Sequence, residues 1–103
     1  ICQKFRIKWW RKLLLVKPYI EHKTRDGSFI RVFDSNAKED ELVWHRDKRD
    51  REVTVLDGVG WKLQFENKLP VELKKGNLYN IKAMEYHRLI KGIEGLTLRI
   101  WER

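Results

Sequence analysis

The sequence predicts an all-β domain, a jelly-roll or small barrel, and three observations support this. Short runs of apolar, β-branched or aromatic residues recur about every 8–12 residues, with Gly, Asn, Asp or Pro between them. No stretch after residue 17 keeps a long helical period. Many short antiparallel strands in a chain of 103 residues must close or double over to protect their edges.

The expected strands follow one another between turn signals. A turn cluster at 25–28 precedes the first of them, and Gly58 and Gly60 separate the third from the fourth. In the fourth, Trp61, Leu63 and Phe65 alternate with polar residues and should share one face. The eight expected strands are 29–33, 41–45, 52–56, 61–66, 71–73, 78–81, 86–90 and 96–101.

Composition excludes several classes of protein. Apolar residues make up 42% of the chain, with five Trp, four Phe and three Tyr, which is too much apolar surface for a disordered segment. The longest apolar run, 13–16, is too short for a membrane span or a signal peptide. The single cysteine excludes an intrachain disulfide and a Cys-based zinc cluster. We therefore expect an intracellular, cytoplasmic protein.

The net charge of +8 is concentrated at the N-terminus. Six basic residues and no acidic ones lie in 1–17, which leaves 17 basic against 15 acidic residues in 18–103. We therefore expect a basic and aromatic arm, 1–17, followed by one domain, 18–103. The nearly balanced charge of that domain argues against nucleic acid as its partner. The arm, which carries Trp9 and Trp10, suits a membrane interface, single-stranded nucleic acid or a partner subunit, or a strand on the sheet edge.

Three titratable side chains have a spacing that suggests a metal site. His45 and Asp47 are two residues apart, so on an extended backbone they point to the same face. His87, in a later apolar run, could meet them across a barrel. Two imidazoles and one carboxylate suit non-haem Fe(II) and leave positions open, and the same set can hold Zn(II), Mn(II) or Ni(II). The alternatives are structural histidines and an ion pair of Asp47 with a neighbouring arginine.

From Leu42 to Gly92 the chain resembles the cupin superfamily of small RmlC-like jelly-roll proteins. The first cupin motif is His-x-His, three or four residues, Glu, then about six to Gly; here it is His45-x-Asp47, three residues, Arg51, then six to Gly58. The second motif is Gly, five residues, Pro-x-Gly, two residues, His; here the spacing from Gly76 to His87 is kept, although the Pro and Gly are absent.

The resemblance implies a double-stranded β-helix of about 8–10 strands, with His45, Asp47 and His87 as ligands of a divalent metal. It also implies a homodimer or larger assembly formed through the N-terminal arm. Arg51 stands at the position of the motif's glutamate and cannot bind a metal, so it blocks the site if its charge faces inward. The same His-x-Asp and His pattern is similar to the metal triad of 2-oxoglutarate-dependent oxygenases, in which a basic residue such as Arg99 would hold the cosubstrate.

Other residues are candidates for contact with a small-molecule ligand. Arg51 either neutralises a nearby aspartate or binds an anionic substrate. Trp61 either lines a pocket or belongs to the core, and Gln64 either faces the ligand or faces solvent. The full set of candidate substrate-binding residues is Arg51, Gln64, Tyr86, Trp61 and Arg99.

Two functions are consistent with these features. The first is a metal-binding cupin, with Fe(II) as the first choice, acting as an oxygenase- or isomerase-like enzyme on a small polar or carboxylated molecule. The second is a non-catalytic jelly-roll for binding or assembly, such as an accessory or phage virion protein, in which Arg51 marks a lost metal site. The sequence leaves open whether the protein is an enzyme.

Overall fold

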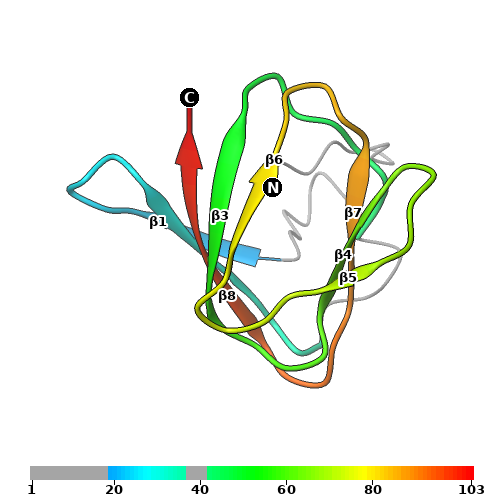
Figure 1. Cartoon of the computed structure of the whole chain (residues 1–103). Helices are drawn as coiled ribbons and strands as arrows, with labels where there is room; N and C mark the ends of the chain where they lie inside the picture. Colours follow the sequence, from blue (N-terminus) through cyan, green and yellow to red (C-terminus); the bar gives the residue numbers. More distant parts are fainter. Residues whose placement is uncertain (1–18, 37–41) are drawn as a thin grey trace, which may run out of the picture.

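Eight strands form two antiparallel sheets that face each other in the computed structural model, which describes residues 19–36 and 42–103 (Figure 1). In chain order the strands are β1 (Tyr19–Lys23), β2 (Phe29–Phe33), β3 (Arg51–Asp57), β4 (Lys62–Phe65), β5 (Val71–Glu72), β6 (Leu78–Ile81), β7 (His87–Ile90) and β8 (Leu96–Glu102). The larger sheet has the order β1-β2-β8-β3-β6, and the smaller one β5-β4-β7. The predicted jelly-roll is confirmed.

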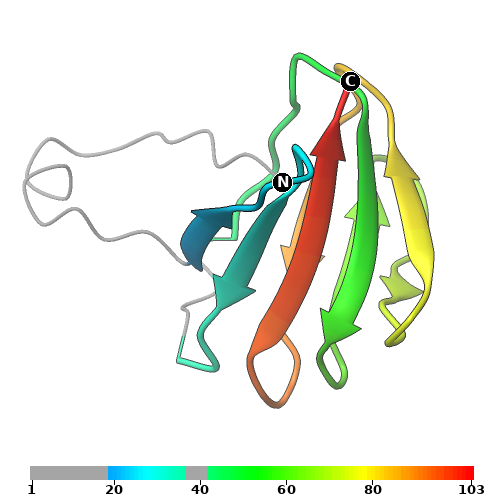
Figure 2. The same ribbon diagram turned by 90° about the vertical axis from the view of Figure 1, so that its left-hand side faces the viewer.

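Strand β8 lies at the centre of the larger sheet, between β2 and β3 (Figure 2). Its residues alternate in burial, so that Leu96, Leu98 and Ile100 point into the barrel. On β3 the partners of Ile100 and Leu98 are Val53 and Val55, which are also buried. Cross-strand pairs of branched apolar side chains therefore form this wall of the core.

Trp61, just before β4, is the largest fully buried side chain. Its ring lies 5.7 Å from that of Phe33 on the opposite sheet, and its indole Nε1 donates a 2.5 Å hydrogen bond to the Glu94 carbonyl. The indole ring can therefore be buried without leaving its nitrogen unpaired. Leu63 of β4 is buried beside it, as the alternation predicted, and Phe65 is half-buried.

Two expectations about strands are corrected. Residues 42–44 form no strand; the segment meets β7 only through an isolated bridge at His45. Leu42 is buried in the core, but residues 42–44 make no ladder of hydrogen bonds with a neighbouring strand, and Trp44 is exposed. Conversely, β1 was not expected, because four of its five residues are exposed and give no apolar pattern. β1 is a strand because it pairs with β2, and the register runs from Tyr19 opposite Phe33 to Lys23 opposite Phe29.

The turn glycines of the motifs adopt positive φ. Gly58, Gly60 and Gly76 have φ of 153°, 81° and 86°. The arm predicted at 1–17 lies outside the described residues. No helix within 19–36 and 42–103 has the length and hydropathy to cross a membrane.

Candidate metal centre

His45 and His87 are joined through their backbones. The His45 amide donates to the His87 carbonyl at 3.0 Å, and the His87 amide donates to the His45 carbonyl at 2.9 Å. Residues paired in this way place their side chains on the same face of the two segments. The two imidazole rings accordingly lie 4.4 Å apart between centroids, and both are buried. The loop before β3 and the start of β7 thus meet at one end of the barrel.

Asp47 joins the two histidines from the same loop. Its backbone carbonyl accepts a 2.7 Å hydrogen bond from the Met84 amide, which ties the loop to the turn before β7. Its carboxylate Oδ2 lies 3.4 Å from His87 Nε2. Each of His45, Asp47 and His87 offers one ligand atom, and these atoms all lie within 4.8 Å of one another. The predicted convergence of the three side chains is therefore present.

Backbone carbonyls fix the orientation of both imidazoles. His45 Nδ1 lies 2.8 Å from the Val43 carbonyl, and His87 Nδ1 lies 2.8 Å from the Glu85 carbonyl. A carbonyl only accepts, so each ring carries a proton on Nδ1 and turns its Nε2 atom towards the cluster. Both Nε2 atoms are buried and have no hydrogen-bond partner among the described residues. Buried acceptors of this kind fit a cation between the three side chains.

The protonation states of His45 and Asp47 at neutral pH also suit a cation. Burial lowers the pKa of His45 from 6.5 to about 4, and the nearby His87 ring adds to the effect, so His45 is neutral. Burial alone would raise the pKa of Asp47, but the His87 imidazole and the Arg51 guanidinium outweigh it and hold that pKa below its usual range. Neutral imidazoles and an ionised carboxylate are the forms that bind metals.

Arg51, at the start of β3, faces this cluster. Its NH1 atom lies 3.7 Å from Asp47 Oδ2. Its Nε and NH2 atoms donate to one oxygen of Glu102, Oε2, at 3.0 and 2.5 Å. The guanidinium is buried, so its charge is balanced mainly by the directly paired Glu102.

Glu102 was not among the predicted site residues. The sequence feature that could have identified Glu102 is its position along β8. It lies two residues after Ile100, in the alternating series of inward residues Leu96, Leu98 and Ile100. In the sheet it stands directly opposite Arg51. An acidic residue in step with a buried apolar series would have indicated a buried partner of opposite charge.

The remaining predicted ligand-contact residues are held by other interactions. Gln64 accepts from Arg88 Nε at 2.9 Å and donates to the Lys68 carbonyl at 3.0 Å. Tyr86 is exposed, with the Arg46 guanidinium 5.0 Å from its ring centroid. Arg99 lies on β8 at a position that alternates with the inward residues, and Trp61 is in the core. The structure thus brings only Arg51 of the five to the three candidate ligands.

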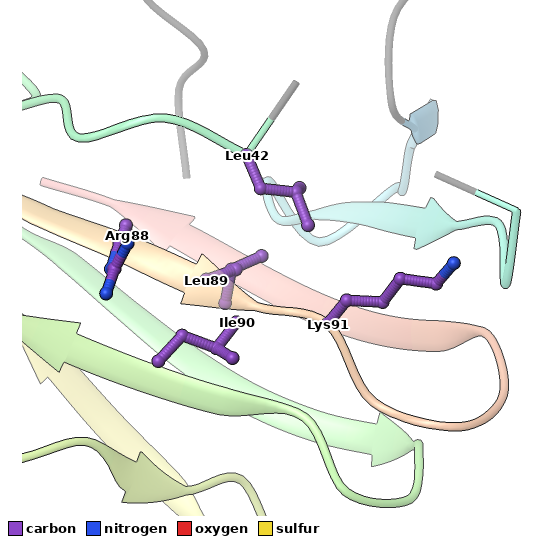
Figure 3. A pocket seen from close by; sticks show the side chains of 5 residues that line it. All are labelled: Leu42, Arg88, Leu89, Ile90 and Lys91. Carbon is purple, nitrogen blue, oxygen red and sulfur yellow. The ribbon is translucent and has the colours of Figure 1, made fainter. Parts of the chain in front are cut away.

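A separate cavity of about 170 Å³ lies along β7, beyond His87 (Figure 3). Leu42 approaches it from the segment that precedes His45, and four consecutive residues, Arg88, Leu89, Ile90 and Lys91, complete its lining. The Arg88 guanidinium also lies 4.8 Å from the centroid of the Trp44 ring. Arg88 is therefore a lining residue that already has partners, in the Trp44 ring and in Gln64.

Solved structures resemble this architecture over most of its length. A cupin-2 domain protein from Shewanella frigidimarina matches with a TM-score of 0.59 at 17% identity, over 95% of each chain. A protein from Neisseria meningitidis matches with a TM-score of 0.58 at 16% identity, over 95% of this chain and 98% of that one. A cupin domain from Bordetella pertussis matches with a TM-score of 0.52 at 12% identity, over 86% and 98%.

Neither a protein-family model nor a curated protein sequence matches the chain. Similarity at these identities concerns the arrangement of the backbone, and it agrees with the two sheets described above. The chain has the fold of cupin-domain proteins, and within it a His45-Asp47-His87 group that could hold a metal ion.

Proposed function

We propose that this domain binds one divalent metal ion through His45 Nε2, His87 Nε2 and the Asp47 carboxylate. The observation that carries the proposal is the pair of buried Nε2 atoms, which have no hydrogen-bond partner among the described residues and lie beside an ionised carboxylate. Leaving two buried acceptors unsatisfied costs roughly 1–3 kcal/mol each, and a bound cation removes that cost.

Fe(II) is the metal we propose first. Two imidazoles and one carboxylate are the ligands of mononuclear iron sites that keep coordination positions open. Zn(II), Mn(II) and Ni(II) accept the same donors and are the alternatives. When bound, the cation would supply Lewis acidity towards a carbonyl group, or an open position for oxygen, at a small polar or carboxylated substrate.

The chain's own residues prepare this site. The carbonyls of Val43 and Glu85 fix the orientation of the two rings through Nδ1. The Met84 amide anchors the loop that carries Asp47. Arg51 opposes the cation by its charge, but Glu102 offsets part of that effect.

A second candidate function has one observation in its favour. Arg51 NH1 lies 3.7 Å from Asp47 Oδ2, so the guanidinium can neutralise Asp47 where the cation would otherwise do so. On this alternative the domain is a non-catalytic binding or assembly protein, and residues 1–17 hold copies together. It predicts that removal of 1–17 changes the oligomeric state and that histidine substitutions leave function unchanged.

Elemental analysis of untagged protein tests the proposal. We expect about one metal ion per chain after anaerobic loading with Fe(II), and less than a tenth of that in His45→Ala and His87→Ala. His22→Ala is the matched control, because His22 is exposed on β1 and should keep full metal content. No metal in the wild type after loading with Fe(II), Mn(II) and Zn(II) would refute the proposal and favour the second candidate.

A further inference from the structure

Arg51 is a buried cation with one edge that makes no hydrogen bond to the described residues. Its side chain is only 6% exposed, and Glu102 occupies Nε and NH2. NH1 is buried, makes no hydrogen bond to the described residues, and lies 3.7 Å from Asp47 Oδ2. An arginine that served only as the partner of Glu102 would not need to direct its remaining edge at the metal ligands.

The two groups that contact the Arg51 guanidinium besides Asp47 differ in their surroundings. Glu102, which holds the guanidinium, is itself 34% exposed in its side chain and lies at the last position of β8. The Phe29 ring lies on the inner side, 5.7 Å from the Arg51 guanidinium carbon. A ligand that reached Arg51 would therefore have to enter beside Glu102, the partly exposed partner of the guanidinium.

The charges of the cluster change sign when a cation binds. Asp47 and Glu102 as carboxylates against one guanidinium leave a single negative charge, and imidazoles that bind a metal do so in their neutral form. A divalent cation turns this into a single positive charge in a largely buried site. One monoanion would neutralise it, and an unpaired buried charge is costly.

We propose that Arg51 NH1 and the bound cation together form a subsite for a small monocarboxylate; this rests on the metal site proposed above. A carboxylate is planar and can accept from the guanidinium with one oxygen while the other faces the cation. A doubly charged phosphate ester would overcompensate the single positive charge. Arg51 is thus the residue that selects a carboxylate group in the substrate.

Arg31 provides a matched control. It also faces the barrel interior, is buried, and is paired with a glutamate, Glu21, at 2.9 and 2.5 Å. Its guanidinium carbon lies 4.0 Å from the centroid of the Tyr19 ring and 5.3 Å from that of Phe29. Arg31 therefore shares the burial and pairing of Arg51, but its carboxylate partner is Glu21 and not a member of the Asp47 cluster.

The test is calorimetric titration with Co(II), in the presence and absence of acetate, at constant ionic strength. If the two ligands favour each other, each must tighten the binding of the other by the same factor. We expect acetate to tighten Co(II) binding to the wild type by about tenfold. Acetamide, which has the same shape and no charge, should have no effect. Arg51→Lys should reduce the effect of acetate to less than about twofold, whereas Arg31→Lys should keep it.

The outcomes separate this inference from the metal site itself. If Co(II) binds but acetate acts equally on the wild type and Arg51→Lys, the carboxylate subsite is wrong and the metal site stands. If Co(II) does not bind to the wild type, both are wrong. Arg51→Met, which keeps the aliphatic stem, is a second variant for which the same loss of the acetate effect is expected, and retention of the effect there would also overturn the inference.

Discussion

His45 and His87 exchange two backbone hydrogen bonds, and this single bridge is what brings a loop residue and a strand residue into one cluster. Because both amides and both carbonyls of the pair are used, the two backbones cannot separate without breaking these bonds. Each ring is further fixed by a carbonyl at Nδ1. The candidate ligands are thus held by backbone contacts, which side-chain substitutions at neighbouring positions should leave intact.

Asp47→Asn should weaken metal binding while the fold is kept. The amide has nearly the shape of the carboxylate but lacks its charge, and charged oxygen donors contribute strongly to the binding of divalent cations. We expect at least a tenfold loss in Zn(II) affinity, measured by competition with a chromophoric chelator, and an unchanged far-ultraviolet circular dichroism spectrum. Equal affinity of the two proteins would show that Asp47 is not a ligand.

Arg51→Met should tighten metal binding in the absence of carboxylates. The substitution removes a positive charge that lies 3.7 Å from Asp47 Oδ2, and at an effective dielectric constant near 20 such a charge opposes a nearby cation by a few kcal/mol. Relaxation of Glu102 into solvent offsets part of this, so we expect an increase of about tenfold in Zn(II) affinity. A decrease would mean that Arg51 supports the site by packing rather than opposing it by charge.

The metal-free protein should lose stability in mild acid because of His45. The unfolded chain binds a proton at this residue near pH 6.5, whereas burial lowers the pKa in the folded chain to about 4. The contribution is therefore present above pH 6.5 and is lost as the pH falls from 6.5 towards 4, by on the order of 3 kcal/mol in total.

Urea unfolding with EDTA at pH 7.5, 5.5 and 4.5 measures this dependence. His45→Asn keeps a donor for the Val43 carbonyl but does not titrate, so its free energy of unfolding should fall less over the same range. Parallel curves for the two proteins would show that another group is responsible.

Two glycines should differ in their tolerance of a methyl group. A Cβ at Gly92 would lie 2.3 Å from the Val59 carbonyl oxygen and 2.5 Å from the Trp61 amide nitrogen, so backbone must move. A Cβ at Gly76 would meet nothing within 4 Å, and only its φ of 86° opposes substitution. Gly76→Ala should cost about 1 kcal/mol, and Gly92→Ala several times more, in thermal or urea unfolding. Equal losses would contradict the close approach at Gly92.

The strands that carry an apolar alternation could be predicted from the sequence, and those that do not could not. Phe29–Phe33 was expected with the bounds it has, because a turn cluster precedes it and apolar residues fill it. Strand β1 is exposed at four positions and exists through its pairing with β2, which is a tertiary contact that local composition does not encode.

The convergence of the three candidate ligands was likewise predictable, and its environment was not. The spacing of His45 and Asp47 and the position of His87 in a later strand indicated convergence, which the structure shows. The pairing of Arg51 with Glu102 joins residues 51 positions apart. It depends on the register of β3 against β8, which sequence alone leaves undetermined.

Anomalous diffraction from crystals loaded anaerobically with Fe(II) tests the central claim most directly. We expect one peak at the iron edge, at bonding distance of roughly 2.0–2.2 Å from His45 Nε2, His87 Nε2 and an Asp47 carboxylate oxygen. The peak should vanish in His87→Ala crystals treated in the same way. No peak among these three side chains, with the Arg51 guanidinium in contact with Asp47 instead, would contradict the account and leave a jelly-roll without a metal.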